Sequence, residues 1–528
     1  MYDIIIKGGT VYDGSGAEPK PMDVGIVGDR IAALGELSSA KETRIIDAHG
    51  LAVMPGAVDI LNHSDTHWTL FDEPSQESLL RQGITTIIGG SCGSSLAPIV
   101  SPKALESLRQ WVDISRLNIN WQTVDEYLKF IASRPTGVNY GTLVGHMTLR
   151  SGTLRTNTKK VSEEHIKEMQ GVIGTAFRDG AFGISFGLAF DNAETITLHE
   201  MEELATSARA YGALAAFHLR DEGKHLVPSI NEVVDIARTS GANIEIGHLK
   251  AIGQSAWEDF SVALDLLRRA RTDGLNIHAD FFPYNRTGSL LYTMLPQWAK
   301  EGGKDAIMQR LRDPEKKRII LNDLKALTLH YDRVTFASTL RKTGLVGKTL
   351  ADAALAIGLP PEEALLNVLL INELSVVIFG HTLKDDHLRL LLKEPYTFIS
   401  SDGIGKAEQG HLSSTGNLVH PRSYGTVPTA LSFAKDSKGE IAHTEVVQKL
   451  TMGPADKVGI KDRGRIAKDT YADIVVFDPS RIRDNATYEN PYRYPTGIEW
   501  VIINGNIAVE QSTYRGTLAG KVLRSSQQ

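Results

Sequence analysis

One cysteine occurs among the 528 residues, and it follows a β-branched run that breaks into glycines and serines. Residues 85–88 read TTII and lead into GGSC at residues 89–92, a pattern typical of a strand buried on both faces and followed by a loop. A lone cysteine forms no internal disulfide, so Cys92 fits either a small buried hydrophobe or a metal ligand. Other residues that could do chemistry decide between these two interpretations.

Two histidines end apolar runs further along the chain. Residues 213–218 read ALAAFH, and residues 243–248 read NIEIGH. One such histidine is usually a hydrogen-bonded structural residue. Two of them at strand ends, together with a thiol, instead indicate a shared metal site. A thiolate and two neutral imidazoles give the three protein ligands that a catalytic zinc keeps, with a fourth position for water. We therefore predict zinc ligation by Cys92, His218 and His248, because thiolate disfavours magnesium and calcium.

A carboxylate follows another strand-like run, since residues 396–403 read YTFISSDG. An Asp before Gly is commonly a turn residue. At the end of a barrel strand, Asp402 is also a candidate general base for a zinc-polarised water and a proton donor for a leaving nitrogen. We predict this second role for Asp402.

The segments that must position these residues alternate strand-like runs with helical patterns. Eight candidate strands can be found, which is the number that a closed (β/α)8 barrel needs, and such barrels carry their chemistry at the carboxyl ends of the strands. The strands are expected at residues 54–61, 84–91, 139–146, 182–187, 213–218, 244–249, 276–282 and 397–402.

The rest of the chain predicts two additions to this barrel. Residues 286–395, roughly, are too long for a plain loop and rich in helical pattern, so we expect a helical insertion that covers the barrel mouth. Short strands with turn signals at both ends predict a small β-sandwich built from both termini. The fold class is α/β: a TIM-like barrel of residues 54–444 with this insertion, and a β-sandwich domain of residues 1–53 and 445–528.

Composition narrows the classes of partner. Hydrophobic residues make up 42% of the chain, charged residues 23%, and the formal net charge is −6. This mildly acidic balance without a basic block argues against nucleic acid, and no apolar run approaches the roughly 20 residues that span a bilayer. With one cysteine and a strand pattern directly after Met1, we expect a cytoplasmic protein without a membrane partner.

The ordered motifs resemble those of the N-acyl-D-amino-acid deacylases (D-aminoacylases) of the amidohydrolase superfamily, essentially from end to end. The matching motifs are MPGAVD at 54–59, GITT at 83–86, SCG at 91–93, LVGHMTLR at 143–150, HLRDE at 218–222, GHLK at 247–250, FPY at 282–284, SDG at 401–403 and HPRSYG at 420–425. The resemblance implies a zinc enzyme with a small N-acyl amino acid as its substrate.

The resemblance also implies roles for individual residues. Zinc would be held by Cys92, His218 and His248, with Asp402 as the catalytic acid and base. A cationic pair and hydroxyl groups would suit an anionic substrate, because arginine can grip a carboxylate bidentately. The implied contacts to the substrate's carboxylate and amide are Lys250, Tyr284, Ser289 and Arg422. In the mechanism that we expect from this site, Tyr284 or His146 would help to stabilise the oxyanion.

Two positions depart from the family's pattern. The family has His-x-His after the first strand, whereas this chain has Leu61-Asn62-His63, so a second metal site is incomplete. His63 could bind a weak second ion with Asp402, orient the water or fill space. After Gly-Leu the family usually has Glu and Tyr, whereas this chain has Ala189-Phe190, which predicts a less polar pocket wall.

The function expected from these observations is zinc-dependent hydrolysis of N-acyl-D-amino acids to a carboxylate and a free D-amino acid. A cyclic-amide hydrolase of the hydantoinase or dihydroorotase kind is an alternative, but those enzymes generally bridge their metals with a carboxylated lysine, and Cys92 argues against it. A non-catalytic scaffold is the third possibility, suggested by Leu61 and opposed by the presence of Cys92, His218, His248 and Asp402 together.

Overall fold

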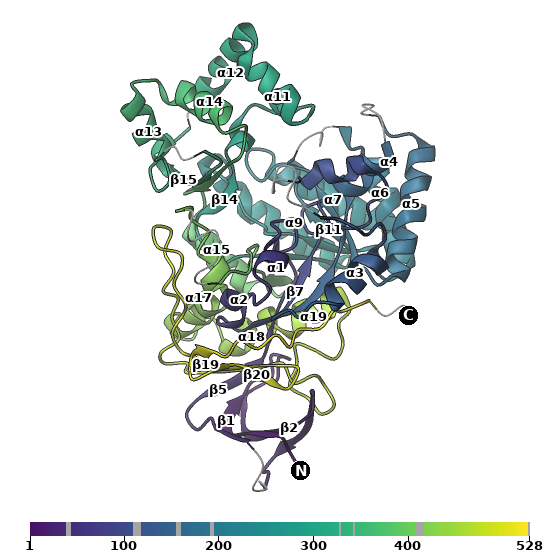
Figure 1. Ribbon diagram of the computed structural model, residues 1–528, viewed down its shortest axis with the longest axis vertical. Helices are drawn as coiled ribbons and strands as arrows, with labels where there is room; N and C mark the ends of the chain where they lie inside the picture. The colour runs from purple at the N-terminus through teal and green to yellow at the C-terminus, as the bar shows by residue number, and fades with distance from the viewer. Residues whose placement is uncertain are drawn as a thin grey trace.

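A barrel of parallel strands forms the centre of the computed structural model (Figure 1). The structure describes residues 1–38, 44–108, 114, 118–154, 160–190, 195–326, 329–341, 344–407 and 416–525. The barrel strands are β6 (Ala57–Asp59), β7 (Ile84–Gly89), β8 (Asn139–Thr142), β9 (Val144–Gly145), β10 (Gly183–Gly187), β11 (Leu214–His218), β12 (Asn243–Ile246), β13 (Ile277–Phe281) and β17 (Thr397–Ile399).

The ring closes through two hydrogen-bonded groups of strands, ordered β17-β13-β12-β11-β10-β9 and β6-β7-β8. Only Leu143 separates β8 from β9, and its amide donates to the Gly89 carbonyl, so these two pieces act as one strand. A parallel bridge between Asn62 and Gly403 joins the ends of β6 and β17. With β8 and β9 counted together, the barrel has the eight strands expected from the sequence.

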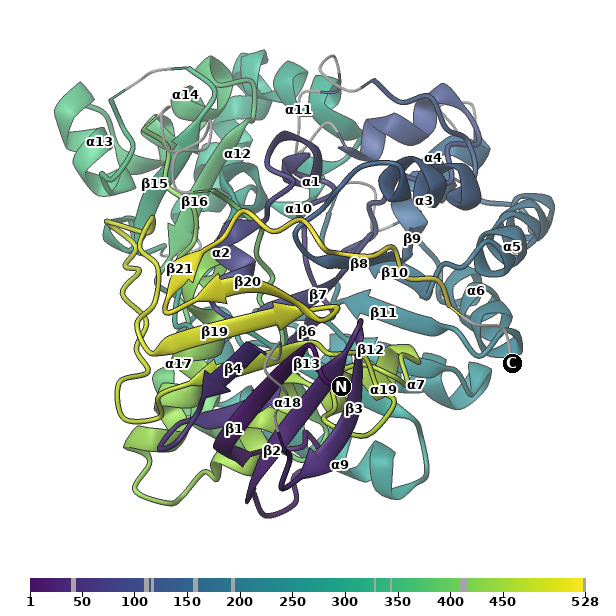
Figure 2. The same ribbon diagram turned by 60° about the horizontal axis from the view of Figure 1, so that its bottom comes forward.

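Amphipathic helices cover the outside of the barrel (Figure 2). Helix α5 (Glu163–Arg178) begins with a capping box between Ser162 and His165, and α7 (Leu226–Ser240) ends at Gly241, whose φ of 61° suits a glycine cap. Their apolar faces join the strands in one core. Other elements here are α1 (Thr69–Asp72), α2 (Glu77–Leu80), η1 (Pro102–Leu108), α3 (Val124–Ala132), α4 (His146–Leu154), α6 (Leu198–Ala210), α8 (Gln254–Trp257), α9 (Asp259–Thr272) and α17 (Arg422–Asp436).

The first expected strand, residues 54–61, is divided between two sheets. Strand β5 (Ala52–Pro55) belongs to the terminal sheet, and only β6 enters the barrel. The change occurs at Gly56, whose amide donates to the Asp473 carbonyl and whose Cα lies so close to Thr85 that a Cβ would be 2.2 Å from Thr85 Oγ1. The chain therefore passes from the terminal sheet to the barrel at Gly56 and does not continue as one strand.

Both ends of the chain contribute to a nine-stranded sheet, with order β21-β20-β19-β18-β5-β1-β2-β3 and β4 beside β1. Its remaining strands are β1 (Ile4–Val11), β2 (Lys20–Val27), β3 (Arg30–Gly35), β4 (Arg44–Asp47), β18 (Ile474–Phe477), β19 (Ile498–Ile503), β20 (Asn506–Glu510) and β21 (Thr513–Tyr514). Figure 2 shows the purple N-terminal strands beside the yellow C-terminal ones. The joint is the antiparallel pairing of β5 with β18.

Two helices near the expected domain boundary at residue 445 belong with the barrel. Helix α18 (His443–Leu450) contacts β17 and β6, and α19 (Met452–Val458) contacts the same two strands. Val446 and Leu450 lie in the barrel core. We therefore propose that the barrel unit continues through α19, and that the C-terminal part of the β domain begins after it.

The insertion between β13 and β17 combines a sheet with helices, whereas the sequence suggested helices alone. Strands β14 (Thr287–Leu290), β16 (Val376–Gly380) and β15 (Val334–Thr339) form an antiparallel sheet in that order. The β-branched runs of β15 and β16 explain the pairing. The other elements are η4 (Leu291–Met294), α10 (Gln297–Lys300), α11 (Gly303–Arg312), α12 (Pro314–Ala326), η5 (Tyr331–Arg333), α13 (Leu350–Ile357) and α14 (Pro361–Ile371).

The insertion has an apolar core of its own, formed by buried side chains between residues 290 and 378. Helix α15 (Asp385–Lys393) instead places Leu388, Leu391 and Leu392 in the barrel core. The separate unit thus ends before α15, and Figure 1 shows it at the end of the molecule opposite the terminal sheet. Across the described ranges, no single helix could cross a membrane; only the bent pair α13 and α14 has the length and composition to do so.

Candidate active site

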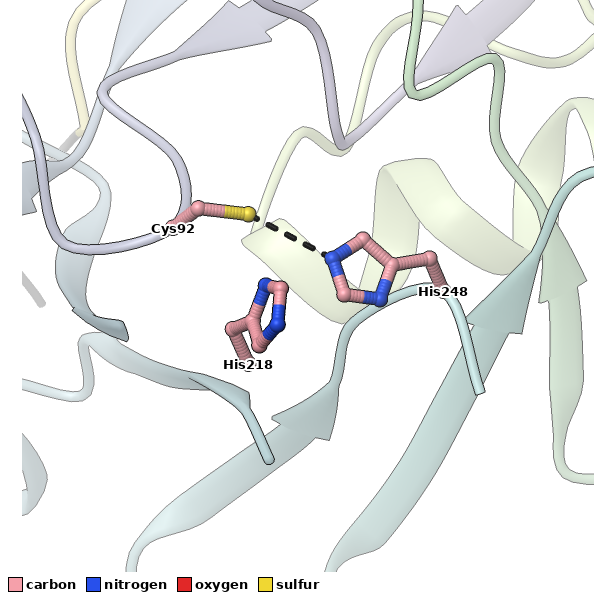
Figure 3. A group of neighbouring side chains, drawn as sticks. All are labelled: Cys92, His218 and His248. Carbon is pink, nitrogen blue, oxygen red and sulfur yellow. Dashed lines mark hydrogen bonds between the residues drawn. The ribbon is translucent and has the colours of Figure 1, made fainter. Parts of the chain in front are cut away.

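The three predicted metal ligands meet at the carboxyl ends of β7, β11 and β12 (Figure 3). One ligand atom each from Cys92, His218 and His248 lies within 4.8 Å of the others. Cys92 Sγ is 3.5 Å from His248 Nε2, and the two imidazole rings lie edge to face with centroids 4.3 Å apart. Residues separated by more than 150 positions, such as Cys92 and His248, are therefore brought together as predicted.

The donor set fits a zinc ion. His218 Nδ1 is buried and has no hydrogen-bond partner among the described residues, which is unusual for a polar atom that a protein encloses. Burial and the neighbouring His248 lower the pKa of His218 to about 3, so its ring is in the neutral form that binds metals. Burial raises the pKa of the Cys92 thiol, and a bound zinc ion would favour the thiolate.

The backbone is held in an uncommon conformation at three of the site residues. Cys92, His248 and Asp402 have φ values of 51°, 38° and 47°, in the left-handed region that non-glycine residues seldom adopt. The His248 amide donates to Asp280 Oδ1 at 2.9 Å, and the Asp402 amide donates to the Leu61 carbonyl at 3.0 Å. Such strain persists only where surrounding bonds hold it, and it is concentrated at functional sites.

Asp402 lies between two basic side chains. Its Oδ1 is 3.1 Å from His63 Nε2, and its Oδ2 is 2.6 Å from Arg422 Nη1. Burial opposes ionisation of Asp402, but Arg422 and His248 hold the pKa of its carboxyl well below the usual range. Burial alone would lower the pKa of His63, but contact with Asp402 and Cys92 raises this pKa to about 10. His63 therefore shares the Asp402 carboxylate with Arg422.

Arg422 retains donors for a further partner. Its Nε and Nη1 are buried and make no hydrogen bond among the described residues, so the contact of Nη1 with Asp402 is an ion pair of poor hydrogen-bond geometry. The guanidinium lies 4.8 Å from the ring centre of Phe282. A Cβ added at Gly288 of β14 would be 3.5 Å from Nη2, so the insertion also borders this group. These unused donors suit a carboxylate.

Lys250 is paired with Glu222. Its Nζ is 2.5 Å from Glu222 Oε1 and 2.8 Å from His248 Nδ1. Burial raises the pKa of Glu222, but Lys250, His218 and His248 outweigh burial and hold this pKa well below the usual range. Glu222 had no role in the sequence interpretation. Its position four residues after His218, inside a motif, was the one available signal.

Tyr284 and Ser289 are both buried or partly buried near the junction of barrel and insertion. The Tyr284 hydroxyl donates to Asp484 Oδ2 at 2.7 Å, so a residue from the C-terminal part of the chain fixes it. Ser289 is on β14 next to Gly288, and its Oγ is 3.2 Å from Thr293 Oγ1. Ser289 thus directly follows Gly288, the residue of the insertion that borders the Arg422 guanidinium.

His146 is not brought to the metal ligands by any contact that the structure shows. It is fully buried at the start of α4, and its Nε2 is 2.8 Å from Glu200 Oε1 on α6. Arg150 Nε donates to the same oxygen at 3.0 Å, and the His146 ring packs 5.0 Å from Phe186. This arrangement indicates a role in helix packing, so the expected contact of His146 with the oxyanion gains no support.

An apolar cluster borders the ligands on one side. It consists of Leu61, Cys92, Met147 and Phe190, all buried. The Phe190 ring lies 4.8 Å from that of His218. Leu61 Cδ1 would be 2.9 Å from a Cβ on Gly247, which shows how closely it packs against the residue before His248. Leu61 thus places a methyl group where the family's pattern has an imidazole.

Comparisons with known proteins find relatives that match this chain over its full length. A D-aminoacylase from Alcaligenes xylosoxydans xylosoxydans is 30% identical over 525 residues, covering 99% of this chain and 97% of the relative. An N-acyl-D-glutamate deacylase from the same organism is 28% identical over 522 residues, covering 99% and 96%. No family model matches the chain.

Solved structures of N-acyl-D-amino-acid deacylases resemble this chain over its full length. An N-acyl-D-glutamate deacylase from Bordetella bronchiseptica, complexed with zinc and a phosphonate that mimics the tetrahedral intermediate, superposes with a TM-score of 0.83 at 26% identity and covers 99% of both chains. A D-aminoacylase, whose binuclear centre is described as activated by one metal and attenuated by the second, has a TM-score of 0.82 at 28% identity and covers 99% and 100%. This chain belongs to the D-aminoacylase (N-acyl-D-amino-acid deacylase) family of the amidohydrolase superfamily.

Proposed function

We propose that this protein hydrolyses N-acyl-D-amino acids to a carboxylate and a free D-amino acid, with zinc held by Cys92, His218 and His248. The observation that carries the proposal is the position of Arg422 beside Asp402. A buried guanidinium with unused donors lies against a candidate general base, Asp402, whose other oxygen contacts His63. The predicted metal ligand His248 is close enough to lower the pKa of Asp402. The names of the relatives, which are deacylases of D-amino acids, add support.

The residues divide the reaction between them. Zinc bound at the three ligands would polarise the amide carbonyl and favour ionisation of a water molecule. Arg422 binds the carboxylate of the substrate through the donors that are otherwise unused. Asp402 takes a proton from the attacking water and gives it to the nitrogen of the leaving amino acid. Because the substrate carboxylate then shares Arg422, Asp402 becomes a stronger base once substrate is bound.

We infer that one tightly held ion is sufficient. Leu61 removes one ligand from a second site, and His63 already contacts Asp402, which is the remaining carboxylate there. A D-aminoacylase of similar structure is described as activated by one metal and attenuated by a second. The absence of an imidazole at residue 61 therefore agrees with an active enzyme that has one metal.

The expected substrate is a linear amide. Hydantoinases share the fold with TM-scores near 0.56, but at 16% identity that likeness extends to the fold alone. Cys92 occupies the end of β7 and is part of the ligand cluster, as a centre with one thiolate-bound ion requires. The apolar wall made by Leu61, Met147 and Phe190 suits an uncharged group of the substrate next to the scissile bond.

Amine release from paired N-acetyl-D- and N-acetyl-L-amino acids tests the proposal. Purified protein loaded with one equivalent of zinc should hydrolyse D substrates and leave the L forms intact. Chelator should abolish the activity and zinc should restore it, while Cys92→Ala should stay inactive under both conditions. Zinc-loaded protein that releases no amine from any N-acyl-D-amino acid, or Cys92→Ala that keeps both zinc and activity, would refute the proposal.

A further inference from the structure

We infer that Asp59 is a positioning residue for the general base. Its side chain joins the first barrel strand to the last one and thereby sets where the Asp402 carboxylate lies relative to His63. This role rests on the proposed function, in which Asp402 moves both protons. Asp59 ends β6 and the motif MPGAVD, and no step of the proposed reaction uses it.

The seam between β6 and β17 differs from the next one around the barrel. Strand β13 pairs with β17 along the whole of that strand, whereas the bridge between Asn62 and Gly403 joins β17 to the end of β6. The His63 amide donates to the Gly403 carbonyl at 2.9 Å, and the Asp402 amide donates to the Leu61 carbonyl at 3.0 Å. The side chains of His63 and Asp402 therefore meet across this seam, 3.1 Å apart.

The Asp59 carboxylate supplies side-chain hydrogen bonds across the seam. Its Oδ1 accepts from the Ser401 amide at 2.8 Å, and its Oδ2 accepts from the Ser401 hydroxyl at 2.5 Å. The side-chain amide of Asn62 donates to Oδ2 at 2.9 Å. Burial raises the pKa of Asp59, and the bonds from Ser401 and Asn62 offset part of that rise. One buried carboxylate thus binds the residue before Asp402 and the residue before His63.

These bonds hold Asp402 in its left-handed conformation. A φ of 47° is uncommon for a residue other than glycine, so neighbouring bonds must maintain it. Asp59 accepts the amide hydrogen of Ser401, and the Gly403 amide donates to the Ser401 hydroxyl at 3.0 Å. Because that hydroxyl gives its own hydrogen to Asp59, it is oriented to accept from Gly403. Asp59 therefore acts on both peptide groups that flank Asp402.

A double-mutant cycle with Asp402 tests this role. Asp59→Asn sets one amide group against that of Asn62, so the seam should shift and displace the Asp402 carboxylate. With zinc content unchanged, kcat should fall by about 10-fold to 100-fold and KM should change by less than about 3-fold. In the Asp402→Asn background the same substitution should lower kcat by less than about 2-fold, because the group that it positions is already lost.

Ser401→Ala tests the same seam with a smaller change, and it applies even if Asp59→Asn does not fold. It removes the hydroxyl that links Asp59 to the Gly403 amide and leaves the carboxylate and its bond to the Ser401 amide in place. Here kcat should fall by about 3-fold to 10-fold, as expected for the loss of one or two hydrogen bonds. This loss should also disappear in the Asp402→Asn background.

Asp473→Asn is the matched control. Asp473 is a carboxylate buried to the same degree that accepts from a side-chain amide, of Asn139, and from a backbone amide, of Asn504, away from the metal ligands. The substitution should lower the free energy of unfolding, measured in urea, but kcat of the folded protein should equal that of the wild type. A loss of kcat caused by general destabilisation would appear in this variant too.

The outcomes separate the role of Asp59 from the proposed function. If zinc-loaded wild-type protein releases no amine, or if Asp402→Asn keeps near-normal kcat, the proposed mechanism is wrong and the role of Asp59 is lost with it. If Asp402→Asn is impaired but folded Asp59→Asn and Ser401→Ala keep the wild-type kcat, Asp59 does not position the base and the proposed function stands. Equal losses of kcat from Asp59→Asn with and without the Asp402 carboxylate would overturn the role in the same way.

Discussion

At the scale of single residues, the site depends on how a few buried charges share their partners. Asp402 has His63 on one oxygen and Arg422 on the other, and Glu222 holds Lys250 and faces two imidazoles. Burial strengthens each of these contacts and makes an unpaired charge costly. Substitutions here should therefore change catalysis or metal binding in separable ways.

Replacing Asp402 by Asn tests the assignment of both proton steps. The amide keeps the volume but cannot take a proton, so kcat should fall by at least about 100-fold. Zinc content should stay near that of the wild type, because the thiolate and imidazoles remain. Steady-state kinetics and metal analysis measure the two effects, with Asp235→Asn on the exposed face of α7 as control. Near-normal kcat in Asp402→Asn would mean that another group, such as His63, carries the proton.

Replacing Arg422 by Lys tests carboxylate recognition. Lysine keeps the charge but lacks the planar fork, so KM for N-acyl-D-amino acids should rise by about 10-fold or more while kcat changes less. An N-acyl amine that lacks the carboxylate should be hydrolysed slowly and equally by both proteins. An unchanged KM, or an equal effect on the substrate without a carboxylate, would contradict this role.

At the scale of elements, the site is made where strands end and loops begin. Gly90 illustrates the constraint, because its φ is 71° and a Cβ there would lie 2.1 Å from the Leu143 carbonyl oxygen. The Gly90 amide donates to buried Asp65 at 2.7 Å, which fixes the loop two residues before Cys92. The end of β6 is equally constrained, since Leu61 accepts a hydrogen bond from Asp402 through its backbone and packs against Gly247 through its side chain.

Leu61→His at the end of β6 should create a second metal site. The new imidazole would supply the ligand that the chain lacks beside His63 and Asp402, so metal analysis after zinc loading should rise from one ion to two. Activity of the variant should fall in excess zinc, whereas wild-type activity should be flat. Leu61→Met is the control for altered packing. Two ions bound stoichiometrically by wild-type protein would show that Leu61 does not exclude the second.

At the scale of the whole molecule, a buried polar network joins the barrel to the terminal sheet. Asp473, before β18, pairs with Arg463, and both side chains are 1% exposed. The side-chain amide of Asn139 on β8 donates to Asp473 Oδ2 at 3.0 Å, and the backbone amide of Asn504 donates to Asp473 Oδ1 at 2.7 Å. Strands from distant parts of the chain are thus fixed together beneath the site.

Removing Asp473 should destabilise the protein strongly. Asp473→Ala leaves Arg463 buried and unpaired, and the free energy of unfolding should drop by about 3–5 kcal/mol. Asp462→Ala removes the partner of Arg30, an exposed pair at 3.4 Å, and should cost about 1 kcal/mol or less. Urea unfolding followed by circular dichroism compares them. Equal losses in the two variants would contradict the importance of this network.

The sequence alone was enough to predict the barrel and the meeting of Cys92, His218, His248 and Asp402 at its mouth. Both follow from local patterns: a short apolar run specifies a buried strand, and Cys92, His218 and Asp402 follow such runs directly or within a few residues. Because parallel strands of a barrel all end at the same rim, residues that end strands must meet there. The joining of both termini could likewise be predicted, since each end is rich in short strands.

The tertiary structure decided what those local patterns leave open, namely which partner each polar group has. His146 shares a motif with the family but pairs with Glu200 of α6, and Glu222 pairs with Lys250 and faces both histidines. The division of residues 52–59 between two sheets and the sheet inside the insertion also depended on pairing with remote strands. Hydrogen bonds and ion pairs between residues far apart in sequence depend on the packing of whole elements, and no local periodicity encodes them.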